Sequence, residues 1–202
     1  MSDPGPVPVA ASLPTYGGWL SAASGYDDAL ARQKDSGSPV LVYFFTDWCP
    51  YCKQFDASVA PMADSKLLRV RVNPETGDRD KQLASTFGVS GYPSIFLIPR
   101  AGASPQRVDD GVSREAPPDA QKFVDSCKQT VVNDLWRAGA SAVGPATPDL
   151  DRALQFDPMN DSILNTRASI RWKAGYRKSA LDDSSRACAL GNATACKNAR
   201  GG

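Results

Sequence analysis

Residues 40–53, with the sequence VLVYFFTDWCPYCK, join an apolar segment to two closely spaced cysteines. Residues 40–45 are apolar throughout and rich in β-branched and aromatic side chains, which predicts a strand covered on both faces of a mostly parallel sheet. Pro50 suits the first position of a helix, and apolar residues three and four apart from Cys52 onward predict a helix over residues 49–60. We therefore expect the C-x-x-C motif formed by Cys49 and Cys52 to lie where a buried strand leads into a helix.

The neighbouring segments alternate between helical and extended patterns. Residues 68–72 alternate apolar and charged side chains, which predicts a half-buried strand. This order predicts an α/β fold in which helices flank a mixed central sheet that contains one hairpin. The remaining expected elements are helices over residues 19–34, 78–87 and 118–131, a strand over 94–98, and an antiparallel edge strand over 106–112.

Cys49 and Cys52 form the candidate catalytic pair. A cysteine at a helix N-terminus faces unpaired backbone N–H groups and the positive end of the helix dipole, which favours the thiolate. Cys52 would lie one turn further along, close enough to attack a mixed disulfide on Cys49. We therefore expect Cys49 to be the nucleophile and Cys52 the resolving cysteine, with Pro50 and Tyr51 restraining the ring between them.

Composition excludes several other kinds of chemistry. The 202 residues include no histidine, which excludes Ser-His-Asp and Cys-His catalysis and histidine metal ligands. The pair could instead be half of a zinc site or a purely structural disulfide, but zinc would need a second C-x-x-C that the chain lacks. A C-x-x-C between a strand and a helix favours redox chemistry, and we expect no metal and no cofactor.

Charge and hydropathy exclude two classes of partner. Lys and Arg number 23 against 22 Asp and Glu, with no basic run, so we expect no nucleic acid partner. The longest apolar stretch, residues 40–45, is far short of the roughly 18 residues of a membrane-spanning helix, so we expect no membrane span.

Residues 42–53 and 88–94 resemble the two signature segments of thioredoxin-like proteins: the active-site segment, and the loop in which a proline follows a cis peptide bond. The resemblance covers residues 19–130. This segment is similar to the C-terminal domain of thiol:disulfide interchange proteins. It implies a thioredoxin fold, a protein-disulfide oxidoreductase, and an active site built around Cys49 and Cys52. The implied neighbours of the cysteines are Trp48, Pro50, Tyr51, Tyr92 and Pro93.

The chain departs from that family at the proton acceptor. Thioredoxins place a buried acid six residues before the nucleophile, where this chain has Tyr43, and Arg69 stands in the place of the neighbouring lysine. Asp47 is expected near the site but at the surface, so the resemblance assigns no proton acceptor to Cys52. The Pro-Tyr dipeptide also occurs in glutaredoxins, and C-x-x-C proteins span roughly −270 to −120 mV, so both directions of electron flow stay open.

The last third of the chain resembles a helical repeat. Residues 153–158 resemble the end of a tetratricopeptide repeat, and Ala187 follows Ala153 by 34 residues, the period of that repeat. We expect this unit to pack for stability rather than to bind a partner, and to supply no catalytic group.

Residues 187–196 resemble the cysteine-containing Sel1-like variant of such repeats. Cys188 and Cys196 would then face each other across a turn at Gly191 and form a structural disulfide. The alternative is two small buried thiols, and Cys127 is the unpaired fifth cysteine.

The expected organisation is a flexible N-terminal tail (1–15), a thioredoxin-like domain (16–132) and a helical TPR/Sel1-like extension (133–202). The tail lacks the basic and apolar parts of a secretory signal. A Cys188–Cys196 disulfide would favour a periplasmic or secreted protein, and a cytoplasmic location is the alternative.

The expected substrates are protein thiols and disulfides, with an upstream redox partner protein. One alternative is a redox-sensitive interaction protein, in which the repeat binds a partner and the C-x-x-C is a latch without turnover. An exposed Cys49 would favour the enzyme and a buried Cys49 the latch. A second alternative is a Cu(I) metallochaperone with Cys49 and Cys52 as ligands.

Overall fold

The computed structural model describes residues 11–58, 66–108, 119–141 and 147–200. Its backbone divides into two compact units, Leu13–Val131 and Val132–Gly202, the latter together with Met1–Ser12. Within the segment expected as a tail, residues 1–10 lie outside the described residues, whereas Leu13 is buried.

The first unit is built on one mixed sheet, whose described strands are β1 (Leu20–Ser21), β2 (Val40–Phe44), β3 (Leu68–Val72), β4 (Ser94–Ile98) and β5 (Gln106–Val108). The strands lie in the order β1-β3-β2-β4-β5. β3 is parallel to both β1 and β2, whereas β4 is antiparallel to both β2 and β5. All five residues of β2 are buried, which confirms the predicted central strand.

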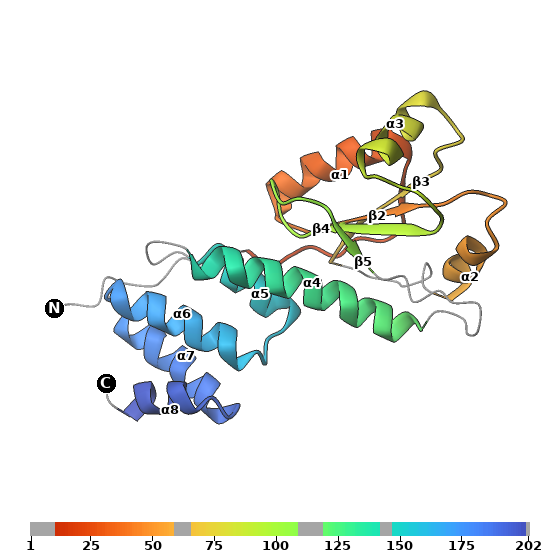
Figure 1. The fold of residues 1–202 in the computed structure, drawn as a ribbon. Helices are drawn as coiled ribbons and strands as arrows, with labels where there is room; N and C mark the ends of the chain where they lie inside the picture. The colour runs from red at the N-terminus through yellow and green to blue at the C-terminus, as the bar shows by residue number, and fades with distance from the viewer. Residues whose placement is uncertain (1–10, 59–65, 109–118, 142–146, 201–202) are drawn as a thin grey trace. The chain divides into compact units, whose positions relative to one another are not determined.

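Helices cover both faces of this sheet (Figure 1). α1 (Ala22–Ser36) and α3 (Asp78–Thr86) lie on one face, where Phe44 belongs to the main apolar core. α2 (Pro50–Ser58) and the first part of α4 (Ala120–Ala140) lie on the other face. There the Tyr43 ring lies 4.8 Å from the Phe55 ring, which lies 5.2 Å from Phe123. Since neighbouring strand residues point to opposite faces, β2 anchors both layers. This is the predicted α/β architecture.

β3 differs from its prediction as a half-buried strand. Arg69 is only 3% exposed, and its guanidinium lies 5.3 Å from the centre of the Trp19 ring. The prediction was wrong because the Arg69 side chain lies against the Trp19 ring, so that even a charged residue of this strand is buried. The predicted helix over 19–34 also begins later, because residues 20 and 21 pair with β3 instead.

α4 continues well past residue 131, where the sequence pattern ends it, and runs to Ala140. Gly139, inside this helix, is a packing position. A Cβ added to it would lie 2.5 Å from Leu150 Cγ, on α5 (Pro148–Phe156). Glycine therefore allows the α4 and α5 backbones to approach closely.

The second unit continues with α6 (Asp161–Lys173), α7 (Arg177–Ala189) and α8 (Ala193–Arg200). Gly175 and Gly191 have positive φ angles of 90° and 98° in the turns before α7 and α8, a conformation that glycine adopts without strain. The core of this unit consists of small and aliphatic side chains, including Leu150, Ala153, Ile163, Leu164, Ala168, Ala180, Ala187 and Ala195.

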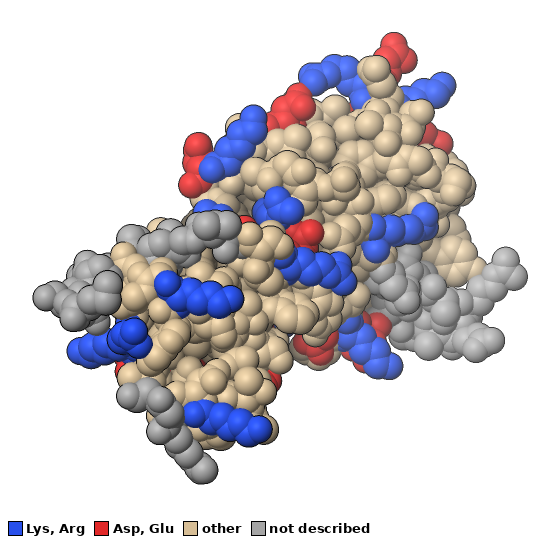
Figure 2. Space-filling model, turned by 60° about the vertical axis from the view of Figure 1, so that its left-hand side comes forward, with Lys and Arg blue, Asp and Glu red and all other residues tan. Residues whose placement is uncertain are grey.

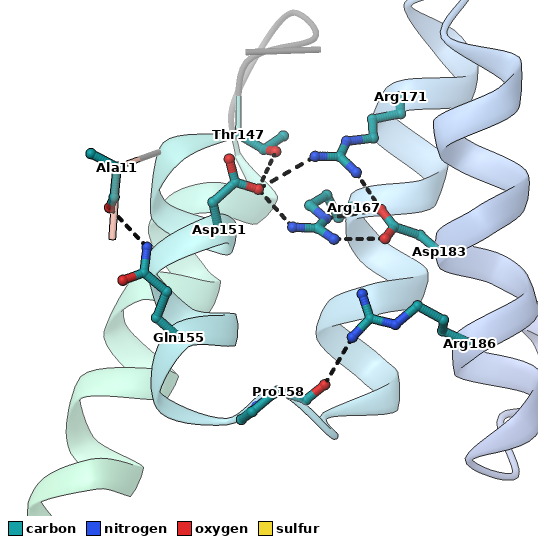
Figure 3. A network of polar contacts seen from close by, with 9 residues as sticks. All are labelled: Ala11, Thr147, Asp151, Gln155, Pro158, Arg167, Arg171, Asp183 and Arg186. Carbon is teal, nitrogen blue, oxygen red and sulfur yellow. Dashed lines mark hydrogen bonds and ion pairs between the residues drawn. The ribbon is translucent and has the colours of Figure 1, made fainter. Parts of the chain in front are cut away.

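A buried ion-pair network links α5, α6 and α7 (Figure 3). Arg167 donates hydrogen bonds to Asp183 at 2.6 and 2.8 Å and to Asp151 at 2.7 Å. Arg171 donates to the same two carboxylates, at 2.8 Å to Asp183 and 3.4 Å to Asp151. Burial acts to lower the pKa of Arg167, but hydrogen bonds and charges from Asp183 and Asp151 outweigh it, so that pKa is raised. The pKa of Arg171 is lowered, by burial first and then by the charge of Arg167.

Candidate redox site

Cys49 lies in the loop between β2 and α2, at the N-cap of the helix. Its carbonyl accepts a hydrogen bond from Lys53 N–H at 3.3 Å, which makes it the last residue before the first helical turn. Its Sγ accepts a hydrogen bond from the backbone N–H of Cys52 at 3.1 Å. The two cysteines form a disulfide, with their Cα atoms 5.3 Å apart. The strand, loop and helix that the sequence predicts thus bring the two sulfurs together.

Both cysteines are buried in this oxidised state, with Cys49 2% and Cys52 1% exposed. The burial of Cys49 favours the redox latch over the enzyme. The exposed fraction of 2% is that of the disulfide form, in which each sulfur is covered on one side by the other.

Tyr43 occupies the position where thioredoxins hold a buried acid. It is 1% exposed, and its hydroxyl donates a hydrogen bond to the Cys52 carbonyl at 3.3 Å. Asp47 is exposed and accepts a hydrogen bond from Asn73 Nδ2 at 3.3 Å, as expected for a surface position. Beneath Cys52, the chain therefore places a phenol rather than a carboxylate.

Trp48 links the loop between β2 and α2 with the loop that contains Tyr92 and Pro93. Its indole is 64% exposed and its Nε1 donates to Glu75 Oε1 at 2.9 Å, while its ring meets the Tyr92 ring edge-on at 6.1 Å. The Tyr92–Pro93 peptide bond is cis, the isomer expected from the sequence, and Pro93 is buried. Pro50 and Tyr51 form the first turn of α2, so the structure gathers the predicted neighbours around one loop cluster.

Glu75 was missed by the sequence reasoning. It is 27 residues from Trp48 in the chain, and no spacing pattern links the two. Glu75 and Tyr92 also line a hollow of about 420 Å³, together with Pro74, Thr76, Gly77, Asp78 and Lys81. The hollow therefore adjoins the two residues that hold the exposed indole.

The other cysteines are separate from this site. Cys127 is a buried free thiol, and burial raises its pKa to about 12. Cys188 and Cys196 form a disulfide between α7 and α8, with Cα atoms 4.5 Å apart. In the described part of the chain, no group of three or more Cys, Asp or Glu side chains is placed to hold a metal ion.

Two surface properties bear on possible partners. Among the described residues, no helix has the length and apolarity needed to cross a membrane. On the face drawn in Figure 2, Lys and Arg side chains are scattered among neutral surface.

Comparison with known proteins places this site in a family. The model of the thioredoxin-like domain matches residues 26–116, which include Cys49, Cys52 and Pro93. A solved structure of thioredoxin from Thermus thermophilus is 25% identical, with a TM-score of 0.42, over 61% of this chain and 90% of that one.

The chain is also similar to curated relatives. The chain is 28% identical to protein disulfide isomerase-like 2-1 of Oryza sativa over 72% of this chain and 40% of the relative. It is 33% identical to the thiol:disulfide interchange protein DsbD of Ralstonia nicotianae over 44% of this chain and 16% of the relative. It is 30% identical to thioredoxin 1 of Nostoc over 39% of this chain and 76% of the relative. The chain thus spans less than half of the first two relatives and most of the third, and it belongs to the thioredoxin-like family.

Proposed function

We propose that the protein is a thiol-disulfide oxidoreductase that exchanges disulfides with protein substrates through Cys49 and Cys52. The observation that carries this proposal is the disulfide between a cysteine at the helix N-cap and a cysteine one turn further. Membership of the thioredoxin-like family supports it, since relatives include proteins named as disulfide isomerases and thioredoxins.

In the reducing direction, the Cys49 thiolate attacks one sulfur of a substrate disulfide. A mixed disulfide forms and the other substrate sulfur leaves as a thiolate. The Cys52 thiol then gives up its proton and attacks Cys49 Sγ. This step forms the Cys49–Cys52 disulfide and releases the second substrate thiolate. Two electrons pass from the cysteine pair to the substrate, and the reverse sequence oxidises a dithiol.

The helix start supplies the electrostatic part of this mechanism. Negative charge on Cys49 Sγ faces the Cys52 N–H, which lies 3.1 Å away, and the positive end of the α2 dipole. The thiolate is therefore stabilised both as an attacking group and as a leaving group. The Cys52 proton has no carboxylate acceptor at position 43, and we propose that water accepts it as the substrate opens the site.

The redox-latch alternative is favoured by one observation, the burial of Cys49. A Cys52→Ser variant separates the two functions. An oxidoreductase of this kind accumulates mixed disulfides between Cys49 and substrate proteins, because the resolving thiol is missing. A latch forms none, and a Cys49→Ser variant is the matched control in which the adducts must disappear.

We propose further that the protein works in an oxidising compartment, such as the periplasm, and receives its redox state from an upstream partner protein. The Cys188–Cys196 disulfide supports this location, since structural disulfides persist outside the reducing cytosol. Peptide mapping after thiol blocking in native cells tests it. A disulfide-linked peptide pair is expected, and free thiols at both positions would place the protein in the cytoplasm.

We propose that α5 to α8 form a TPR/Sel1-like unit, with domain limits close to the expected 16–132 and 133–202. The helical hairpins, the glycine turns and the small buried residues support this assignment. A chain ending at Val132, the expected domain limit, keeps the first unit whole and tests the packing role, because loss of the second unit should then lead to aggregation.

A further inference from the structure

The second unit contains a hollow of about 350 Å³ on its α6, α7 and α8 helices, here called the α6–α8 groove. Ala168, Ala180 and Leu181 give it an apolar lining, and the Trp172 side chain, 38% exposed, adds an aromatic surface. The complete lining is Ala168, Ser169, Trp172, Lys173, Ala180, Leu181, Ser184, Lys197 and Asn198. Its volume lies at the lower end of ligand pockets, which suits one or two side chains rather than a helix.

All charged residues that line this groove are positive. Lys173 and Lys197 border it, and its lining includes no Asp or Glu. Neither lysine has a carboxylate within 4.0 Å among the described residues. A third cation, Arg177, lies 4.5 Å from the centre of the Trp172 ring. The groove therefore has positive charge that the rest of the described unit leaves uncompensated.

The two arginines of α6 show that unpaired positive charge is not a general feature of this helix. Arg167 and Arg171 lie inside the unit, and both pair with Asp151 and Asp183. The internal charges are thus matched by carboxylates, whereas the charges at the groove are not. An external anionic group would provide the missing match.

We propose that the α6–α8 groove binds an extended acidic peptide segment of a partner protein. Carboxylates of the segment pair with Lys173 and Lys197, and an apolar side chain packs against Trp172 and Leu181. An aromatic ring beside cations suits a peptide that alternates acidic and apolar residues better than it suits a bare inorganic anion. This interaction is separate from the redox reaction proposed above, and it gives the helical unit a role in recognition.

The test starts from a cysteine-free library of random displayed peptides, selected on the full-length oxidised protein. The lack of cysteine prevents capture through Cys49. The selected sequences are expected to be enriched in Asp and Glu, with Leu, Ile or Phe among them. The best peptide is then titrated against the wild type and the Lys173→Gln/Lys197→Gln double variant. Its Kd should weaken about tenfold in the double variant and also in high salt.

Lys178→Gln is the matched control, because Lys178 is an exposed lysine of α7 that does not line the groove. It should change the Kd less than twofold. The proposal is overturned if selection yields no acidic enrichment, or if Lys178→Gln weakens binding as much as the double variant does. It is also overturned if inorganic phosphate at millimolar concentration binds the same groove and displaces the peptide completely. Insulin reduction by the same preparations reports separately on Cys49 and Cys52, so the two proposals fail independently.

Discussion

The backbone N–H of Cys52 donates a hydrogen bond to the Sγ of Cys49 over 3.1 Å. This contact joins the two cysteines through the first turn of α2, in addition to their disulfide. Once the disulfide is reduced, the same N–H faces a sulfur that carries the negative charge. Of the two cysteines, Cys49 is therefore the one whose thiolate the helix start stabilises.

Alkylation of the reduced protein should therefore select Cys49. At neutral pH, iodoacetamide is expected to modify Cys49 several times faster than Cys52, because the thiolate is the reacting form. Mass spectrometry of peptides from a short time course measures both rates. Faster labelling of Cys52 would reverse the roles assigned to the two cysteines.

Cys127 should stay unmodified in the folded protein. Burial raises its pKa to about 12, so its thiol stays protonated near neutral pH. At pH 8 only about one molecule in ten thousand would carry the thiolate. Labelling is expected only after urea unfolds the chain. Rapid modification of Cys127 in the native protein at pH 8 would show that this thiol is accessible.

Asp183→Asn should destabilise the helical unit strongly. The substitution leaves Arg167 and Arg171 buried with one carboxylate fewer, and breaking a buried ion pair in this way costs about 3–5 kcal/mol of unfolding free energy. Urea unfolding followed by circular dichroism measures the loss. Asp182→Asn, at the exposed neighbouring position, should change stability by less than about 0.5 kcal/mol. Equal effects of the two substitutions would contradict the network drawn in Figure 3.

Gly139→Ala should also lower stability, although alanine is the better helix former. The new Cβ would lie 2.5 Å from Leu150 Cγ and 3.1 Å from its backbone nitrogen, so α4 and α5 must separate. Such overpacking costs about 1–3 kcal/mol. Arg137→Ala, at an exposed position of the same helix, provides the control in the same unfolding assay. A gain in stability for Gly139→Ala would show that propensity outweighs the close approach.

The local features of the site were predictable from the sequence because neighbouring residues encode them. Strand residues 40–44, the N-cap position of Cys49 and the start of α2 at Pro50 depend on short spacings of residue types. The Tyr92–Pro93 loop followed from a family resemblance rather than from periodicity.

Features that depend on distant residues were not predictable in this way. Arg69 belongs to an alternating pattern that predicts a half-buried strand, but its side chain is buried against the ring of Trp19, which lies far earlier in the chain. Glu75 meets Trp48 across 27 residues of chain, and Arg167 meets Asp183 across 16. Gly139 lies inside α4, and only the approach of α5 shows its role. In each case, tertiary packing decides the outcome.

Catalysed reduction of insulin disulfides by dithiothreitol tests the central claim most directly. Wild-type protein at a small fraction of the insulin concentration should accelerate insulin precipitation through many turnovers, and Cys49→Ser should reduce the rate to that of dithiothreitol alone. A wild-type rate no faster than dithiothreitol alone, or an unchanged rate for Cys49→Ser, would contradict the assignment of catalysis to Cys49 and Cys52.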